Sequence, residues 1–227
     1  MKKAYFISGI DTGIGKTVAT GLMARYLRSR GVDAITVKMV QTGCVGFSED
    51  IDEHRRICGG AKFEEDALGL TAPQIFAFPG SARLAARLEG RVVDTAKIVS
   101  AVEACGKAHD VVLVESAGGL CVPLAENLLS VDLAAAQGWP LVLVTCGRLG
   151  SLNHTLLSLE AARARGMAVA GVVYNWSPGV EPEIDEDTPA NIAEYLKGWN
   201  MPSAIVRIPE VPADGPYPDI DFSEIFK

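Results

Sequence analysis

The sequence lacks the features that mark membrane proteins and proteins that bind polyanions. No apolar run reaches the roughly 18 residues that a membrane-spanning helix needs, and the first apolar stretch is too short for a signal peptide. Lysine and arginine number 21 against 28 aspartates and glutamates, and they form no cluster. We therefore expect no membrane partner and no nucleic-acid partner for this chain, whose formal charge is −7.

Cysteine is scarce and scattered. The five cysteines are odd in number, form no C-x-x-C pair and show no metal-ligand spacing to a histidine. This pattern is typical of reduced thiols, so we expect a cytoplasmic location. Apolar residues make up 48% of the 227 residues, which is enough for a sizeable core and excludes a disordered or collagen-like chain.

What the sequence does contain is a regular alternation of short β-branched runs and longer amphipathic stretches. Several short runs, such as VVLVE and LVLVT, are apolar at consecutive positions, as in strands buried on both faces of a parallel sheet. Residues 1–227 are expected to form one α/β domain with a doubly wound, mostly parallel sheet flanked by helices. The predicted strands are Ala4–Ser8, Ala34–Val40, Val111–Glu115, Leu141–Cys146, Val169–Asn175 and Ala204–Ile208. The predicted helices are Lys16–Arg30, Ile51–Cys58, Ser81–Leu88, Thr95–Ala108, Leu152–Arg165 and Pro189–Lys197.

Two segments fit neither pattern. Ser177–Asp187 is acidic and contains proline, which predicts a surface loop. Pro209–Lys227 contains four prolines, which predicts an irregular tail that either wraps over the surface or frays. Neither segment predicts a domain boundary.

A glycine-rich loop follows the first predicted strand. It reads Gly9-Ile-Asp-Thr-Gly-Ile-Gly-Lys-Thr17 and leads directly into a helix. In such loops backbone amides turn toward phosphate oxygens, the lysine reaches the terminal phosphates and the hydroxyl binds Mg²⁺. We therefore predict a site of the P-loop NTPase type for a nucleoside triphosphate with Mg²⁺, rather than a turn that binds nothing. Five residues, not the usual four, separate Gly9 from Gly15.

The same loop bears on the class of nucleotide-binding protein. ATP-switch proteins of the MinD and ParA type carry a second lysine five residues before the main one. Asp11 stands at that position here, and a carboxylate supplies no cation to the phosphates. An ATP switch of that type is therefore disfavoured.

Further charged residues follow later strands. Lys38, in the string KMVQTG, is either a solvated lysine or a cation that stabilises a phosphoryl group in transfer. Thr42 in the same loop is a turn residue or a substrate contact. Glu115 follows four apolar β residues, as an acid beside Mg²⁺ does, although strands also end in an acid by chance. Asp50 and Asp52 lie in an acidic loop before a predicted helix, where they would cap it or serve a metal.

Together these motifs resemble those of the dethiobiotin synthetases, a family of ATP-dependent ligases in biotin biosynthesis. The strings GIDTGIGKT, KMVQTG, VESAGG and GSLNHT are similar to the family's GTDT-x-VGKT, KPVQTG, VEGAGG and G-x-x-NHT, in the same order between Met1 and about Pro209. The resemblance implies that 7,8-diaminononanoate takes up CO₂ as a carbamate, that ATP phosphorylates the carbamate to a mixed anhydride, and that ring closure yields dethiobiotin, ADP and phosphate. It also implies a homodimer, because in this family the NHT segment comes from the partner subunit.

The resemblance implies a role for each matching residue. Lys16 and Lys38 would be the catalytic, charge-stabilising pair. The Mg²⁺ ligands would be Thr17, Asp50 and Glu115, with Asp52 as the competitor of Asp50. The substrate contacts would be Thr12, Thr42, Ser151, Leu152 and Asn153. The ATP contacts would be Gly13, Ile14, Gly15, Lys16, Thr17, Val18, Asp50, Glu115, Ser116, Ala117, Gly118, Asn175, Trp176, Pro209 and Glu210.

The sequence also departs from the family's pattern. Met39 replaces a proline after Lys38, which removes a backbone constraint. Ser116 replaces a glycine and adds a side chain where the backbone approaches the ligand. In Gly80–Ala86, where the family often reads near S-P-H-x-A-A, Arg83 adds a charge that would face the substrate or the surface.

Some readings compete with this one. His154 is expected to pack or cap a helix rather than act as a base, and His54 and His109 show no ligand partner in the sequence. The alternative functions are a cobyrinate-type amide-forming ligase, an ATP switch that binds a partner or a membrane surface, and a small-molecule kinase. The chain has no room for the glutaminase domain that the first usually carries, and the last does not account for the NHT segment.

Overall fold

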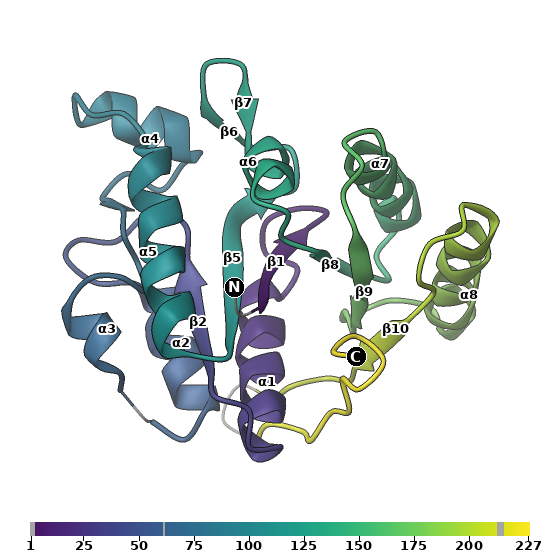
Figure 1. Cartoon of the computed structure of the whole chain (residues 1–227). Coiled ribbons are helices and arrows are strands. Elements are labelled where there is room, and N and C mark those ends of the chain that lie inside the picture. Colours follow the sequence, from purple (N-terminus) through teal and green to yellow (C-terminus); the bar gives the residue numbers. More distant parts are fainter. Residues whose placement is uncertain (1–2, 61, 213–215) are drawn as a thin grey trace.

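The computed structural model describes residues 3–60, 62–212 and 216–227. Its centre is a sheet of six parallel strands in the order β10-β9-β8-β1-β5-β2, which confirms the predicted α/β class (Figure 1). The strands are β1 (Lys3–Gly9), β2 (Ala34–Lys38), β5 (Val111–Gly119), β8 (Leu141–Cys146), β9 (Val169–Asn175) and β10 (Ile205–Ile208). All six overlap the predicted strands, but β2 ends two residues early and β5 runs on through Ser116–Gly119.

Side chains of each central strand alternate between two hydrophobic clusters. In β1, Tyr5 and Ile7 pack on one face of the sheet and Phe6 packs on the other. In β5, Leu113 shares the face of Ile7, and Val114 shares the face of Phe6. Both faces are therefore buried, which explains the uninterrupted apolar runs in the sequence.

Helices cover both faces, as the doubly wound prediction requires. Buried side chains of α1 (Lys16–Ser29) and α2 (Glu49–Ile57) join one cluster. The other cluster takes side chains from α4 (Ala82–Leu88), α5 (Thr95–Ala108), α6 (Ser130–Ala136), α7 (Ser151–Arg163) and α8 (Pro182–Gly198). No helix among the described residues is long and apolar enough to cross a membrane.

Several short elements were not predicted. They are α3 (Glu64–Ala67), the parallel pair β3 (Gln41–Thr42) and β4 (Ile75–Phe76), and the hairpin β6 (Pro123–Ala125) with β7 (Leu128–Leu129). Helix α6 was also missed, since its seven residues are too few for a clear helical period. The β6–β7 hairpin projects beyond the sheet, past the carboxyl end of β5 (Figure 1).

The predicted loop Ser177–Asp187 is partly wrong, because α8 already begins at Pro182. Proline fits the first helical position, where no amide bond is lost, and Glu183 and Asp185 favour the positive end of the helix dipole. Pro189 therefore lies inside the helix and deprives the Asp185 carbonyl of its amide partner. Arg207 of β10 donates to that carbonyl at 2.9 Å, so a tertiary contact replaces the lost bond.

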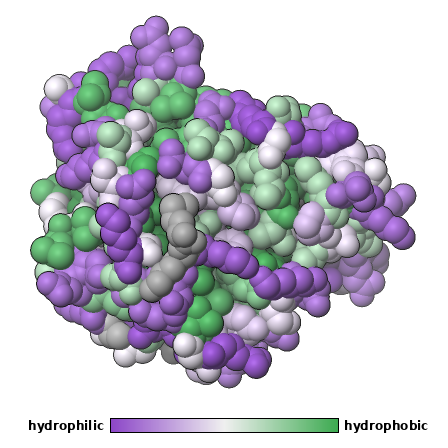
Figure 2. Space-filling view, viewed as in Figure 1, coloured by the Kyte–Doolittle hydropathy of each residue, from purple (hydrophilic) through white to green (hydrophobic). Residues whose placement is uncertain are grey.

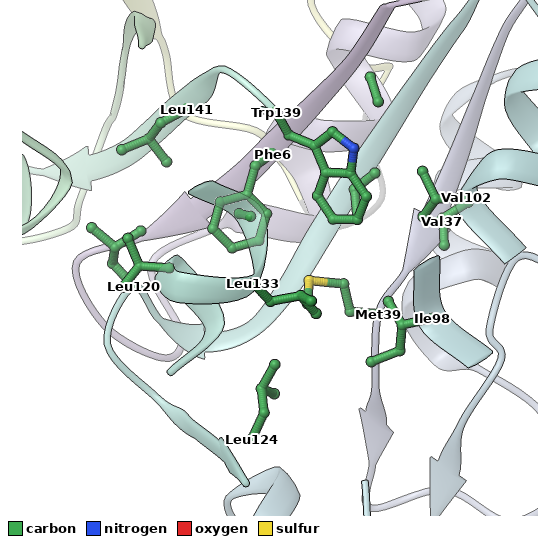
Figure 3. Packing of buried hydrophobic residues seen from close by; sticks show 14 of the residues in the cluster. Phe6, Val37, Met39, Ile98, Val102, Leu120, Leu124, Leu133, Trp139 and Leu141 are labelled. Carbon is green, nitrogen blue, oxygen red and sulfur yellow. The ribbon is translucent and has the colours of Figure 1, made fainter. Parts of the chain in front are cut away.

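The core and the surface separate cleanly. Figure 3 shows Phe6, Met39, Leu133 and Trp139 converging in the larger cluster, where each is at most 7% exposed. The face drawn in Figure 2 is a mosaic of hydrophilic residues with smaller hydrophobic groups between them.

The described part of the tail wraps over the molecule. Phe222 and Ile225 are 0% and 4% exposed and belong to the cluster beneath α1. Arg25 of α1 donates to the carbonyl oxygens of Tyr217 and Pro218 at 3.2 and 2.6 Å. The sequence predicted a tail that either wraps over the surface or frays, and residues 216–227 wrap over the surface.

Candidate functional site

The carboxyl ends of the parallel strands carry nearly all the predicted site residues. The phosphate loop follows β1, Lys38 ends β2, Glu115 lies in β5, Asn175 ends β9, and Pro209 follows β10. Because parallel strands end at the same edge, residues that are up to about 200 positions apart in sequence lie at one edge of the sheet.

The phosphate loop is held in a tight curve. Gly13 and Gly15 have φ of 72° and 85°, which favours glycine, and a Cβ at Gly15 would lie 2.3 Å from Asn175 Nδ2. Lys16 Nζ reaches back and donates to the Asp11 carbonyl at 2.7 Å. Burial, and then the charge of Lys38, lowers the pKa of Lys16 to about 8. A negatively charged ligand in this loop would restore the ordinary protonation of that lysine.

Lys38 sits at the centre of a buried charge cluster. Its Nζ lies 2.5 Å from Asp50 Oδ2 and 2.7 Å from Glu115 Oε1, and it donates to the Ser116 carbonyl at 3.0 Å. Burial opposes its charge, but Glu115 and Asp50 together hold the pKa of Lys38 above its ordinary value. The same proximity, against the cost of burial, keeps the pKa of Glu115 far below its ordinary value. Lys38 is thus a fixed buried cation and not a solvated strand-end lysine.

Thr17 joins the cluster from the phosphate loop. Its hydroxyl lies 3.0 Å from Asp50 Oδ1 and 3.2 Å from Glu115 Oε1, so one hydroxyl and two carboxylates converge. Asp50 is placed by α2, whose N-cap Ser48 accepts from the Ile51 amide at 3.2 Å. The prediction of an acidic loop here was wrong, since both Asp50 and its competitor Asp52 lie in the first turn of this helix. Asp50 faces the cluster and Asp52 is exposed.

The sequence showed no ligand partner for His54, and the structure places its side chain in hydrogen bonds with other protein groups. The side chain is 0% exposed, its Nε2 lies 2.9 Å from Glu115 Oε2, and its Nδ1 lies 3.0 Å from Thr36 Oγ1. His109 also has a partner, because its Nδ1 lies 3.0 Å from Asp33 Oδ2. No periodicity links His54 to Glu115, which is 61 residues away in sequence.

Oxygen donors of this kind fit Mg²⁺. A hard cation prefers carboxylates and hydroxyls, and Mg²⁺ commonly takes one or two carboxylates together with substrate phosphates. Thr17, Asp50 and Glu115 supply that set beside the phosphate loop. Within the described ranges no group of three or more His, Cys, Asp or Glu side chains has the geometry to hold a metal by itself. The residues therefore fit a cation that shares its coordination with a nucleotide.

A cavity of about 300 Å³ opens beside the phosphate loop. Asn175 lines it and donates from Nδ2 to the Ile14 carbonyl at 2.6 Å, while its buried Oδ1 has no hydrogen-bond partner among the residues that the structure describes. An amide oxygen without a partner is free to accept from a planar base. The lining also includes the predicted residues Gly13, Ile14, Gly15, Val18, Trp176, Pro209 and Glu210.

A second cavity, of about 450 Å³, lies on the other side of the loop. Thr12 and Thr42 line it, together with Ala117 and Gly118 of the β5 extension. Gly80 and Ser81, from the segment that departs from the family pattern, complete one wall, while Arg83 is exposed on α4. Neighbouring residues of the phosphate loop therefore line both cavities, Gly13 and Gly15 in the first and Thr12 in the second.

The first turn of α7 lies apart from both cavities. Ser151 is buried, with its hydroxyl 3.3 Å from Cys146 Sγ, and Leu152 packs against the core. Asn153 is exposed, and so are the nearby Leu149 and Leu157. None of the three predicted substrate contacts in this turn lines the cavity at Thr12.

The structure shows how two of the departures from the family's sequence pattern are accommodated. Met39 makes a bond that proline cannot make, since its amide donates to the Glu115 carbonyl at 3.0 Å, so the constraint beside Lys38 is kept by other means. Ser116 does not face the ligand side, because its hydroxyl lies 2.9 Å from Ser8 Oγ in the interior.

The sequence analysis missed a contact beside the phosphate loop: Arg148, after β8, forms an ion pair with Asp11 across the loop. Asp11, whose carboxylate disfavours an ATP switch of the MinD and ParA type, thus has an ion-pair partner.

These features define a class: an α/β protein whose first strand leads through a phosphate loop into a helix, with a buried lysine and two acids at its carboxyl edge. A family profile described as an AAA domain matches residues 3–213. A ParA family ATPase from Chlorobium tepidum TLS has a TM-score of 0.51 and 14% identity over 93% of this chain and 86% of that chain, a likeness of fold alone. The chain is therefore a P-loop protein of the NTPase type.

Two curated relatives specify the family. The ATP-dependent dethiobiotin synthetase BioD 2 of Pasteurella multocida is 44% identical over 88% of this chain and 94% of its own length. The ATP-dependent dethiobiotin synthetase BioD of Chlorobaculum tepidum is 48% identical over 88% of this chain and 84% of its own length. The chain belongs to the ATP-dependent dethiobiotin synthetase family, and the enzyme is an ATP-dependent ligase.

Proposed function

We propose that this enzyme uses ATP and Mg²⁺ to close a urea ring on 7,8-diaminononanoate with CO₂, forming dethiobiotin, ADP and phosphate. The observation that carries the proposal is the cluster of Thr17, Lys38, Asp50 and Glu115 beside the phosphate loop, whose residues also line two cavities. One cavity has the chemistry for a nucleotide base, and the other begins at Thr12 and Thr42. Membership of the family supports the choice of substrates.

The reaction runs in three steps. One amine of the substrate adds to CO₂ and loses a proton, giving a carbamate. A carbamate oxygen attacks the γ-phosphorus of ATP, ADP leaves, and a mixed carbamic–phosphoric anhydride forms. The second amine then attacks the carbonyl carbon and loses a proton, phosphate leaves with the C–O bonding pair, and the ring closes. The protein's main task is to hold these groups in line and to offset the negative charge that builds on oxygen.

Lys38 and Lys16 would supply that positive charge. Lys38 is 5% exposed and is held by Glu115 and Asp50, so its ammonium group is fixed before substrate arrives. Lys16 lies in the phosphate loop, where phosphate oxygens would replace the Asp11 carbonyl as its partner. The substrate's carbamate would contact Thr12 and Thr42 in the cavity beside them.

Thr17, Asp50 and Glu115 would hold Mg²⁺, directly or through water, together with the nucleotide's phosphates. When bound, Mg²⁺ would neutralise phosphate charge and orient the γ-phosphoryl group. Asn175, Trp176, Pro209 and Glu210 would contact the base, and the β5 segment Ser116–Gly118 would approach the phosphates.

We further propose a homodimer in which Ser151, Leu152 and Asn153 complete the partner's substrate cavity. The exposure of Asn153, Leu149 and Leu157 beside one another on one surface supports this assignment. A cytoplasmic location is also proposed, supported by five cysteines that are all unpaired.

The decisive experiment measures ADP release with Mg-ATP and bicarbonate, with and without 7,8-diaminononanoate, and identifies the product by mass. We expect ADP release that depends on the diamine and one dethiobiotin per ADP. ADP release that is indifferent to the diamine, with no dethiobiotin formed, would contradict the proposed substrate and leave only the nucleotide site.

A further inference from the structure

His54 has no role in the proposed reaction. It is a fully buried histidine whose two ring nitrogens both face polar partners and not the apolar core. Glu115, also 0% exposed, divides its carboxylate between two groups of partners. Oε1 meets Thr17 and Lys38 in the site, and Oε2 meets His54.

The direction of the protons in this contact follows from donor chemistry. Arg55 has only donors, and its Nη1 donates to Thr36 Oγ1 at 2.8 Å. Thr36 therefore accepts from Arg55 and has its own proton free for His54 Nδ1, 3.0 Å away. The ionised carboxylate only accepts, so the proton of His54 lies on Nε2 and is donated to Glu115.

These hydrogen bonds restrict the orientation of the Glu115 carboxylate. The terminal torsion of a glutamate is broad, so a carboxylate that is held at one oxygen only can rotate. The His54 bond holds Oε2, and Oε1 is thereby aimed at Thr17 and Lys38. Without it, the buried Oε2 would have no described hydrogen-bond partner, and the carboxylate would turn toward other donors.

Helix α2 couples this contact to the second acid. Asp50 and His54 are four residues apart and therefore lie on the same face of the helix. Asp50 contacts Lys38 directly. His54 contacts Glu115, which in turn contacts Lys38. One rigid turn of helix thus fixes both carboxylates around the lysine and Thr17.

We propose that His54 is a positioning residue that orients the Glu115 carboxylate for the metal–nucleotide complex, acting through a hydrogen bond from Nε2 and not as a packing residue. The inference rests on the proposed role of Glu115 toward Mg²⁺. It predicts that position 54 needs a hydrogen-bond donor at the place of Nε2, since groups that hydrogen-bond to a ligating carboxylate tune its affinity for the metal.

A matched pair of variants tests this. The amide nitrogen of His54→Gln reaches the place of Nε2 and still donates to Glu115, whereas His54→Asn is one bond shorter and reaches only toward Thr36. His54→Leu removes both bonds. His109→Gln, at a buried histidine near the opposite ends of the strands, is the control.

Two quantities are measured: the dissociation constant of Mn²⁺ in the presence of ADP, by electron paramagnetic resonance, and kcat with KM for the diamine. We expect His54→Gln to stay within about threefold of wild type, and His54→Asn and His54→Leu to lose about 10- to 100-fold in Mn²⁺ affinity. In the same two variants kcat should fall while KM for the diamine is unchanged, and His109→Gln should match wild type.

The proposal is overturned if His54→Asn and His54→Gln behave alike, or if His109→Gln loses as much Mn²⁺ affinity as His54→Asn. If His54→Leu fails to fold, the Gln and Asn pair decides. If wild type binds no Mn²⁺ with ADP, the metal assignment of the proposed function fails, and the contrast in kcat between the same two variants still decides the role of His54.

Discussion

At the scale of single residues, the site is governed by the balance of charge around Lys38. A buried ammonium is costly unless it is paired, and two carboxylates and a backbone carbonyl surround this one. That Lys38 and Glu115 follow short apolar β runs was readable from sequence. Their direct contact was not, since it depends on the pairing of β2 with β5, which sets Lys38 beside Glu115 in register.

Lys38→Ala should abolish most turnover while ATP still binds. The variant removes the fixed charge at the reacting group but leaves the base cavity and the phosphate loop intact, and we expect a fall in kcat of at least about 100-fold. Calorimetric ATP titration and dethiobiotin formation measure the two effects. Lys97→Ala, at an exposed lysine of α5, should keep wild-type turnover. Normal turnover in Lys38→Ala would remove this lysine from the mechanism.

Asn175→Ala should weaken nucleotide binding more than chemistry. The change removes the donor to the Ile14 carbonyl, which ties β9 to the phosphate loop, and the free Oδ1 that faces the base cavity. Loss of one or two such bonds predicts a rise of about tenfold in KM for ATP with kcat within about threefold. Asn191→Ala, where the amide bonds only within α8, is the control. An unchanged KM for ATP would mean that Asn175 has no part in binding the nucleotide.

At the scale of elements, α2 carries more of the site than its sequence indicated. Its pattern predicted a helix over Ile51–Cys58, with Asp50 and Asp52 read as an acidic loop, but the helix begins at Glu49. Those acids instead complement the positive end of the helix dipole. The helix is then anchored by its second turn, where Arg55 forms a two-bond ion pair with Asp66 of α3.

Asp66→Asn should destabilise the fold in a pH-dependent way. Burial opposes the charge of Asp66, but bonds from Arg55, the Phe63 amide and Thr71 outweigh it and hold its pKa below 3.8. An acid with a lowered pKa stabilises the folded state above its unfolded pKa and loses that contribution as the pH falls through the folded value. We expect a loss of about 1–3 kcal/mol at pH 7 that shrinks below about pH 4.

Urea unfolding of wild type and Asp66→Asn at pH 7 and at pH 3 measures this difference. Glu103→Gln, at an exposed acid of α5, controls for the change in net charge. A difference between wild type and Asp66→Asn that is the same at both pH values would show that the charge of Asp66 does not stabilise the fold.

At the scale of the whole molecule, the proposed function includes a second subunit. Among the described residues, the lining of the cavity at Thr12 and Thr42 contains no lysine or arginine, and Asn153 is exposed elsewhere on the surface. A C2 dimer would bring the α7 surface of one chain to the cavity of the other. Asn153→Ala should therefore raise KM for the diamine more than it lowers kcat.

Mixing two variants that are each defective at low diamine concentration tests the dimer directly. Equal amounts of Lys38→Ala and Asn153→Ala chains, unfolded and refolded together, should yield mixed dimers in which one of two sites has both residues intact. Activity at low diamine concentration should then recover to about a quarter of the wild-type value. If Asn153 serves its own chain, every site keeps one defect and no recovery occurs. In the control mixture, Glu160→Ala chains take the place of the Asn153→Ala chains, because Glu160 is an exposed residue further along α7.

The sequence by itself determined the alternation of the six main strands with helices, the phosphate loop and the strands after which functional residues lie. These depend on local periodicity and on glycine's freedom at positive φ, which are properties of neighbouring residues. Tertiary structure alone decided that His54 meets Glu115, that Ser116 turns inward toward Ser8, and that Arg207 supports the proline inside α8. Each of these is a hydrogen bond between residues at least 22 positions apart, and only the packing of sheet and helices brings such donors and acceptors together.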